Sequence, residues 1–104
     1  MYETKIGKKY ALPFLDSLPE KSQRIVREHI DRLKINPFPG RGGDKERLVI
    51  DGYVFYRMAV ARSYTIFYRI FRERKTVLVL DIMTAEEAHK RYGRFSIGEL
   101  DDSD

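Results

Sequence analysis

A segment rich in proline and glycine divides this chain into two parts with different hydrophobic periods. Residues 36–43 contain two prolines and three glycines, which remove backbone donors and favour turns. Before this segment, apolar residues recur every three or four positions, as they do in helices packed on a core. After it, apolar and polar residues alternate in several short runs, as they do in strands. Since 104 residues leave room for one domain, we expect helices that pack on a sheet.

The first part predicts a short strand and two helices. Residues 2–6 alternate like a strand, and the apolar residues of 12–18 line one helical face. A longer helix should follow to about residue 35, with Ser17 and Glu20 as its capping box. Its apolar stripe is Ile25, Val26, Ile30 and Leu33, and we expect His29 to be a half-buried packing residue.

The second part predicts four antiparallel strands and a last helix. The strands are residues 47–50, 53–60, 64–71 and 76–82, with a hairpin turn at Asp51-Gly52. Thr84 can cap a helix over residues 85–92, and Gly93 would stop it. The predicted class is therefore α+β: an antiparallel sheet, two N-terminal helices packed on one face, and a short C-terminal helix.

The two faces of the predicted sheet differ in character. One face of the two central strands carries Tyr56, Met58, Ile66 and Tyr68, which we expect to form the core under the helices. The other face mixes aromatic residues with arginines, and such a patch usually marks a partner surface. The alternative is that the last helix or the tail covers it. We assign to this face Phe55, Phe67, Phe71, Val77 and Val79.

The net charge of +4 hides an uneven distribution. Residues 1–92 hold 19 basic and 12 acidic residues, whereas residues 93–104 hold one arginine and four acids. We therefore divide the chain into a basic domain, 1–92, and an acidic tail, 93–104, which we expect to be disordered and to weaken nucleic-acid binding by lying over the basic face. The absence of cysteine excludes disulfides and thiolate metal sites. No secretory or membrane segment is visible, so we expect a cytoplasmic protein that binds neither metal nor membrane.

Several stretches, in this order and spacing, resemble the RelE/ParE superfamily of toxins from toxin–antitoxin pairs, and the RelE branch in particular. They are K-K-Y-A at 8–11, I-D-R-L at 30–33, N-P-F-P-G at 36–40, G-Y at 52–53, Y-R-M at 56–58 and Y-T-I-F-Y-R-I at 64–70. The resemblance spans residues 2–92. It implies a toxin that cleaves messenger RNA on the ribosome, inhibits translation and is neutralised by a cognate antitoxin. The reaction is attack of a ribose 2′-hydroxyl on the adjacent phosphate, and it needs no cofactor.

The resemblance and the predicted second face of the sheet together suggest roles for individual residues. The catalytic candidates are Arg57, Arg62, Glu46, His89 and Tyr92. The RNA-binding candidates are Lys45, Arg47, Arg69, Lys90 and Arg91. The antitoxin-binding candidates are the second-face residues Phe55, Phe67, Phe71, Val77 and Val79.

Two alternatives remain open. Ala59, Thr65 and Ala85 stand where the family usually has basic residues. If these replacements abolish cleavage, the chain is a degenerate module that binds an antitoxin, the ribosome or RNA. The other alternative is a ParE-like inhibitor of DNA gyrase, which needs no RNA-cutting residues.

Overall fold

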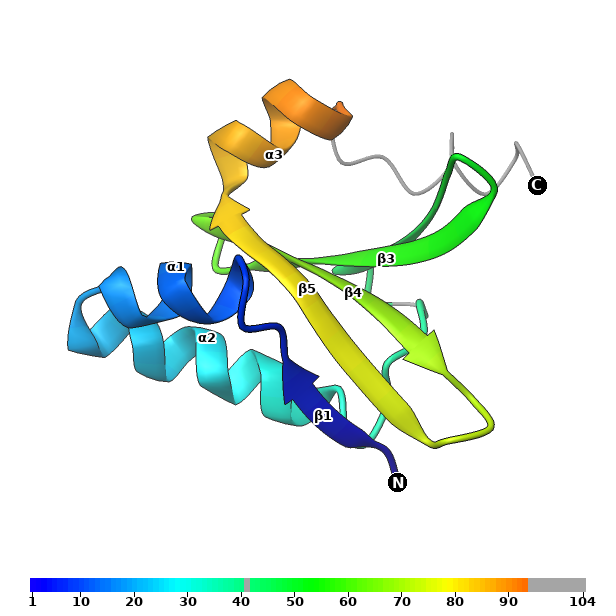
Figure 1. Ribbon diagram of the computed structural model, residues 1–104. Coiled ribbons are helices and arrows are strands. Elements are labelled where there is room, and N and C mark those ends of the chain that lie inside the picture. Colours follow the sequence, from blue (N-terminus) through cyan, green and yellow to red (C-terminus); the bar gives the residue numbers. More distant parts are fainter. Residues whose placement is uncertain (41, 94–104) are drawn as a thin grey trace.

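The computed structural model describes residues 1–40 and 42–93, which form five strands and three helices (Figure 1). The acidic tail predicted from the sequence, apart from Gly93, lies outside these described residues. In chain order the elements are β1 (Glu3–Ile6), α1 (Ala11–Ser17), α2 (Glu20–Arg32), β2 (Lys45–Ile50), β3 (Tyr53–Val60), β4 (Tyr64–Phe71), β5 (Thr76–Thr84) and α3 (Ala85–Tyr92).

The strands form a single sheet in the order β1-β5-β4-β3-β2. The neighbours from β2 to β5 are antiparallel, and β1 pairs in parallel with β5. The turn between β2 and β3 places Asp51 and Gly52 at φ 52° and 83°, which is the left-handed backbone that a tight hairpin needs. The predicted α+β class is confirmed.

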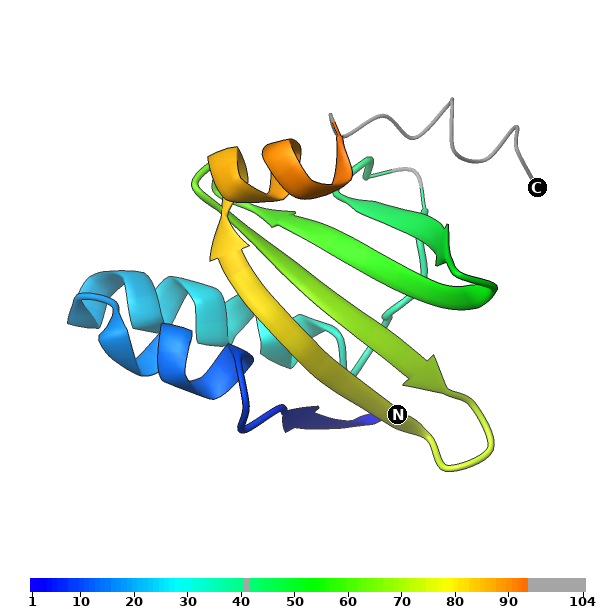
Figure 2. The ribbon, with the colours of Figure 1, turned by 45° about the horizontal axis from the view of Figure 1, so that its top comes forward.

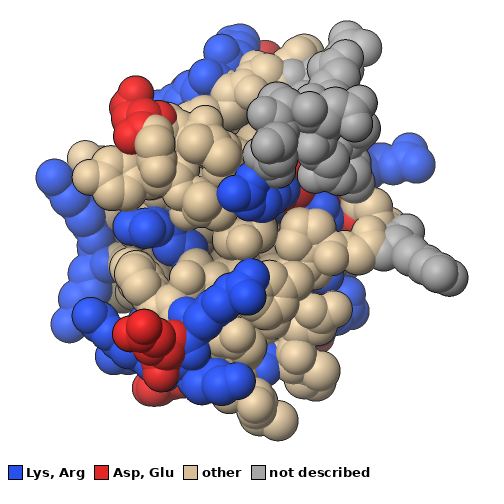
Figure 3. Space-filling model, turned by 90° about the vertical axis from the view of Figure 1, so that its right-hand side faces the viewer, with Lys and Arg blue, Asp and Glu red and all other residues tan. Residues whose placement is uncertain are grey.

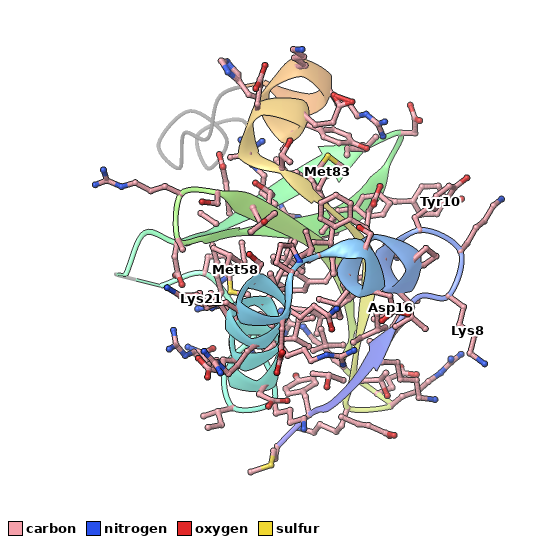
Figure 4. All side chains as sticks on the ribbon, turned by 90° about the vertical axis from the view of Figure 1, so that its left-hand side faces the viewer. Lys8, Tyr10, Asp16, Lys21, Met58 and Met83 are labelled. Carbon is pink, nitrogen blue, oxygen red and sulfur yellow. The ribbon has the colours of Figure 1, made fainter. Side chains whose placement is uncertain are left out.

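Helices α1 and α2 cover one face of the sheet, and the main core lies between the two layers (Figures 1 and 2). Leu15, Val26 and Leu33 are fully buried there against Met58 of β3, as predicted; Figure 4 shows Met58 on the sheet side of these helices. Each such apolar side chain contributes about 1.5–3 kcal/mol when it is fully buried. The helix layer is therefore held mainly by this stripe.

The ends of α2 differ from the prediction. The helix ends at Arg32, short of residue 35, and its N-cap is Pro19, with no side-chain cap. Ser17 does not form the predicted capping box, because it is still the last residue of α1 and its hydroxyl donates to the carbonyl of Phe14 at 2.6 Å. The extended backbone of Pro19, at ψ 152°, starts the new helix instead.

Helix α3 lies over the other face of the sheet and closes a second, smaller core (Figure 2). Leu48, Phe67, Met83 and Ala88 are buried in it, and Met83 lies below α3 in Figure 4. The expectation of an uncovered second face is thus wrong for the half that contains Phe67, which is 5% exposed. The half with Phe55 and Phe71 remains partly exposed.

Val77 and Val79 do not lie on the second face, which is a correction to the antitoxin-binding set. Both are fully buried in the core under α1 and α2. The pairing of β4 with β5 shifts at Phe67/Tyr68, so that one residue of β5 is skipped between Val79 and Asp81. Because side chains alternate strictly along a strand, one extra residue reverses the faces on its two sides. Counting back from the buried Ile82 without the bulge therefore gives the wrong face for both valines.

Candidate functional site

A pocket of about 100 Å³ lies where α3 meets the ends of β3 and β4. Three of the predicted catalytic residues, Arg57, Arg62 and His89, line this pocket. Its other lining residues are Ala59, Tyr64, Thr65, Ala85, Ala88 and Gly93. The set includes all three positions at which the family resemblance expects a basic side chain and this chain has a small one.

Arg62 reaches the pocket from a strained turn. Ala61 and Arg62 have φ values of 50° and 62°, and the amide of Ser63 donates to the carbonyl of Val60 at 3.0 Å. A non-glycine residue in this left-handed region costs roughly 1–2 kcal/mol. This turn joins β3 to β4, and left-handed residues of this kind are those that a tight hairpin needs. The turn fixes Arg62, which is exposed, at the edge of the pocket.

Arg57 is held by a buried ion pair with Glu46. The two residues face each other across β2 and β3. Oε2 of Glu46 accepts from Nε of Arg57 at 3.0 Å and lies 2.9 Å from Nη2. The Arg57 and Glu46 side chains are 2% and 0% exposed. Glu46, which the sequence analysis names as a catalytic candidate, is therefore placed to hold Arg57 and does not itself line the pocket.

The same guanidinium also joins the sheet to the end of α3. Its Nη1 donates to the carbonyl of Gly93 at 3.1 Å. Carbonyl groups at a helix C-terminus lack helical partners and carry partial negative charge, so a cation is favourable there. Gly93 has φ 84°, which ends the helix as the sequence predicts. Glu46, Arg57 and Gly93 thus link β2, β3 and α3 behind the pocket.

Tyr92 does not line this pocket. Its ring lies on Phe67 at 4.6 Å between centroids, and it faces a larger groove of about 820 Å³ between α1 and α3. Asp81 of β5 also lines the groove, and burial raises the pKa of its carboxyl, although the amide of Ile82 donates to it at 2.9 Å. The sequence analysis missed Asp81; the signal was a single acid in an otherwise apolar run, Thr76 to Met83.

The predicted RNA-binding residues are dispersed over the molecule. Lys45 pairs with Asp44 at 3.5 Å. Lys90 and Arg91 each pair with a glutamate one turn earlier on α3, at 3.6 and 3.5 Å. Arg47 and Arg69 both border a hollow near the far end of the sheet, but the Arg69 guanidinium lies on the second face, over the rings of Phe55 and Phe71. None of these five residues lines the pocket beneath α3.

The described residues, 1–40 and 42–93, contain no cluster of metal ligands and no long apolar helix. No group of three or more His, Asp or Glu side chains there is arranged to hold a metal ion. Among the helices of the same residues, none is long and apolar enough to cross a membrane.

The chain is similar to known proteins in sequence and in structure. The sequence model of one family, described as the ParE toxin of the type II toxin–antitoxin system parDE, matches residues 4–89. No curated protein sequence matches the chain.

Solved structures with the same fold include two toxin–antitoxin complexes. A chain of the archaeal RelE-RelB complex from Pyrococcus horikoshii is 27% identical, with a TM-score of 0.67, over 81% of this chain and 94% of that one. A chain of the complex RelBE2 from Mycobacterium tuberculosis is 21% identical, with a TM-score of 0.67, over 80% and 96%. The isolated RelE toxin of E. coli is 16% identical, with a TM-score of 0.55, over 88% and 98%.

Proposed function

Because the chain belongs to the ParE toxin family of type II toxin–antitoxin systems, we propose that it is the toxin of such a pair and that it cleaves messenger RNA on the ribosome. The observation that carries the cleavage proposal is the convergence of Arg57, Arg62 and His89 on one pocket. These side chains come from a strand, a turn and a helix. They supply the two kinds of group that the reaction requires, cations and a proton-transfer group.

The reaction joins the ribose 2′-oxygen to phosphorus and breaks the bond from phosphorus to the 5′-oxygen. The 2′-hydroxyl loses a proton, the 5′-oxygen gains one, and negative charge builds up on the phosphate between these events. Arg62 is exposed at the pocket edge and contacts that phosphate, since a guanidinium binds two phosphate oxygens at once. His89 accepts the proton of the 2′-hydroxyl and returns a proton to the departing 5′-oxygen, because an imidazole both accepts and donates protons through its ring nitrogens.

In this arrangement Arg57 and Glu46 have different roles. Arg57 places positive charge at the inner wall of the pocket while it stays bonded to Glu46. Glu46 is a positioning residue, because a fully buried carboxylate does not reach a substrate oxygen.

The cleavage proposal is tested with purified protein and ribosomes programmed with a defined messenger RNA. We expect cleavage in the decoding site, reduced about 100-fold or more by either His89→Ala or Arg62→Ala. Arg24→Ala is the matched control, because Arg24 lies exposed on α2, which is on the other side of the sheet from α3. If the wild-type protein binds ribosomes and the message stays intact, cleavage is not its activity.

An antitoxin partner is the second part of the proposal. Two of the structural relatives are toxins solved together with their antitoxins, RelE with RelB and the RelBE2 pair. We assign the antitoxin contact to the partly exposed half of the second face, which holds Phe55 and Phe71. Co-expression with the product of the neighbouring gene should yield a complex, and Phe71→Glu should weaken it, because the substitution puts a charge into an apolar contact. A stable complex that Phe71→Glu leaves unchanged would place the contact elsewhere.

Inhibition of DNA gyrase is the alternative function that one observation favours. The pocket walls at Ala59, Thr65 and Ala85 are uncharged where a nuclease of this kind would concentrate cations, and a gyrase inhibitor does not need them. A supercoiling assay separates the two functions: loss of supercoiling with intact messenger RNA supports gyrase inhibition. A protein that is inactive in both assays and harmless when expressed is a binding module without cleavage.

A further inference from the structure

We propose that Arg69 of β4 binds a carboxylate side chain of the antitoxin on the second face of the sheet. The inference rests on the antitoxin partner proposed above, and it names the chemistry by which that partner is recognised. Arg57 and Phe67 pair across β3 and β4, and Phe67 belongs to the second core under α3. Because side chains alternate along a strand, Phe55 and Arg69, each two residues away from that pair, lie on the same face. Arg69, an RNA-binding candidate in the sequence analysis, thus lies in the half of this face that stays partly exposed.

The Arg69 guanidinium lies among three aromatic rings and has no carboxylate partner in the described part of the chain. Its central carbon lies 5.5, 5.6 and 5.2 Å from the ring centroids of Tyr53, Phe55 and Phe71. No carboxylate of residues 1–40 and 42–93 forms an ion pair with it, and its Nε is buried without a hydrogen-bond partner. The rings compensate part of the charge, but an unsatisfied buried N–H group is costly and rare in folded proteins. The guanidinium therefore retains a donor for an acceptor from another molecule.

The side chains around Arg69 indicate that this other molecule is a polypeptide. Leu78 pairs with Arg69 across β4 and β5, and it is partly exposed, as are Phe55 and Phe71. Tyr53 is 58% exposed beside them. Arginine and aromatic side chains grouped on an exposed face are typical of the centre of protein interfaces, where a few residues supply most of the binding energy. Apolar side chains of a partner would bury this hydrocarbon surface, whereas a phosphate backbone would not.

The charge of this area selects an acidic side chain of the partner. Lys5 is exposed on β1 next to Leu78. Figure 3 looks onto the side of the molecule that carries the β4–β5 turn, where Lys and Arg side chains border an uncharged area. A carboxylate bound side-on to the Arg69 guanidinium would accept from Nε and one Nη together, and Tyr53, the most exposed of the three rings, would turn to admit it. The segment recognised is therefore amphipathic, with one Asp or Glu within its apolar face.

The test measures the Kd of the full chain for the product of the neighbouring gene. We expect Arg69→Gln to raise this Kd at least about 30-fold, because it leaves a desolvated carboxylate of the partner unpaired. Arg72→Gln is the matched control, since it removes the same charge three positions away. Arg72 is exposed and lies 4.7 Å from the ring centroid of Phe38, which packs on the helix-side core through Tyr56. Its loss should change the Kd by no more than about threefold.

Two further measurements identify the carboxylate and check the fold. Each Asp and Glu of the partner is replaced in turn by Asn or Gln, and one of these changes should weaken binding to the wild type but have no further effect on binding to Arg69→Gln. Urea unfolding of the free chain follows Arg69→Met. Its midpoint should stay the same or rise, because the substitution removes an unsatisfied donor.

Four results would overturn the proposal. Equal losses of affinity in Arg69→Gln and Arg72→Gln would indicate diffuse attraction alone, and the absence of any acid coupled to Arg69 would exclude a specific pair. A lower urea midpoint for Arg69→Met with an unchanged Kd for Arg69→Gln would indicate a purely structural role. An unchanged Kd together with weaker binding of a short oligothymidylate to Arg69→Gln would mean that Arg69 binds phosphate. All four leave the antitoxin partner in place, whereas the absence of any complex would overturn that partner and this inference together.

Discussion

Removing the Glu46 carboxylate tests whether the buried ion pair holds the pocket together. The pair is almost completely shielded from water, with side-chain exposures of 0% for Glu46 and 2% for Arg57. Glu46→Ala leaves a buried guanidinium without the carboxylate that faces it, at 2.9 and 3.0 Å in the native protein. Breaking a buried pair in this way costs about 3–5 kcal/mol. For a domain of this size, that corresponds to a fall in Tm of at least about 12 °C.

The measurement is urea unfolding followed by circular dichroism, with thermal unfolding as a second readout. Glu86→Ala is the matched control, because Glu86 pairs with Lys90 at 3.6 Å while both side chains are largely exposed. Its loss should change the free energy of unfolding by no more than about 0.5 kcal/mol. The double variant Glu46→Leu/Arg57→Met should recover most of the stability, since two apolar side chains replace both charges.

Two results would refute this reasoning. One is a loss below about 1 kcal/mol for Glu46→Ala, the size expected for an exposed pair. The other is a double variant as unstable as the sum of its single changes, which would mean that the two charges are not coupled. Either result would also remove the positioning role that we give to Glu46.

Three further predictions concern the fold and its response to pH. The Tyr68 hydroxyl is buried and donates to the carbonyl of Pro37 at 2.7 Å, so Tyr68→Phe should lower the free energy of unfolding by about 1 kcal/mol in urea at pH 7. Burial raises the pKa of Tyr68 far above its ordinary value. The protonated hydroxyl therefore stabilises the fold up to about pH 10, and this contribution is lost at higher pH. The free energy of unfolding of the wild type should consequently fall more than that of Tyr68→Phe between pH 8 and pH 11. A Cβ at Gly7 would lie 2.9 Å from the carbonyl oxygen of Val79, so Gly7→Ala should lower the free energy of unfolding in urea by about 1–3 kcal/mol. A Cβ at Gly40 would have open space around it, so Gly40→Ala should leave that free energy nearly unchanged. Because burial raises the pKa of Asp81, its ionised form opposes folding, so Asp81→Asn should raise Tm at pH 7 and lose that advantage as the pH falls towards 3.

The order and type of the elements follow from local sequence signals. The Pro/Gly segment at 36–43 separates the two periods, and Asp51-Gly52 fixes one hairpin by its backbone preference. Thr84 caps α3 by accepting from the amide of Glu87 at 3.1 Å, as predicted. Each of these features depends only on a residue and its near neighbours in the chain, so it can be predicted from the sequence.

The sequence by itself determined the fold class, most of the helix-side core and the candidate site residues. Only the tertiary structure decided which of them meet. Glu46 and Arg57 are 11 positions apart, and their burial as a pair depends on strand pairing and on the cover supplied by α3. The single skipped residue in β5 reversed the faces of Val77 and Val79, since alternation transmits one insertion along the whole strand. Arg47 of β2 lines the hollow at the far end of the sheet together with Arg69 and Arg72, which lie at and just after the end of β4, so no local spacing could reveal that they meet. Burial and charge pairing depend on long-range contacts, whereas turns and periods do not.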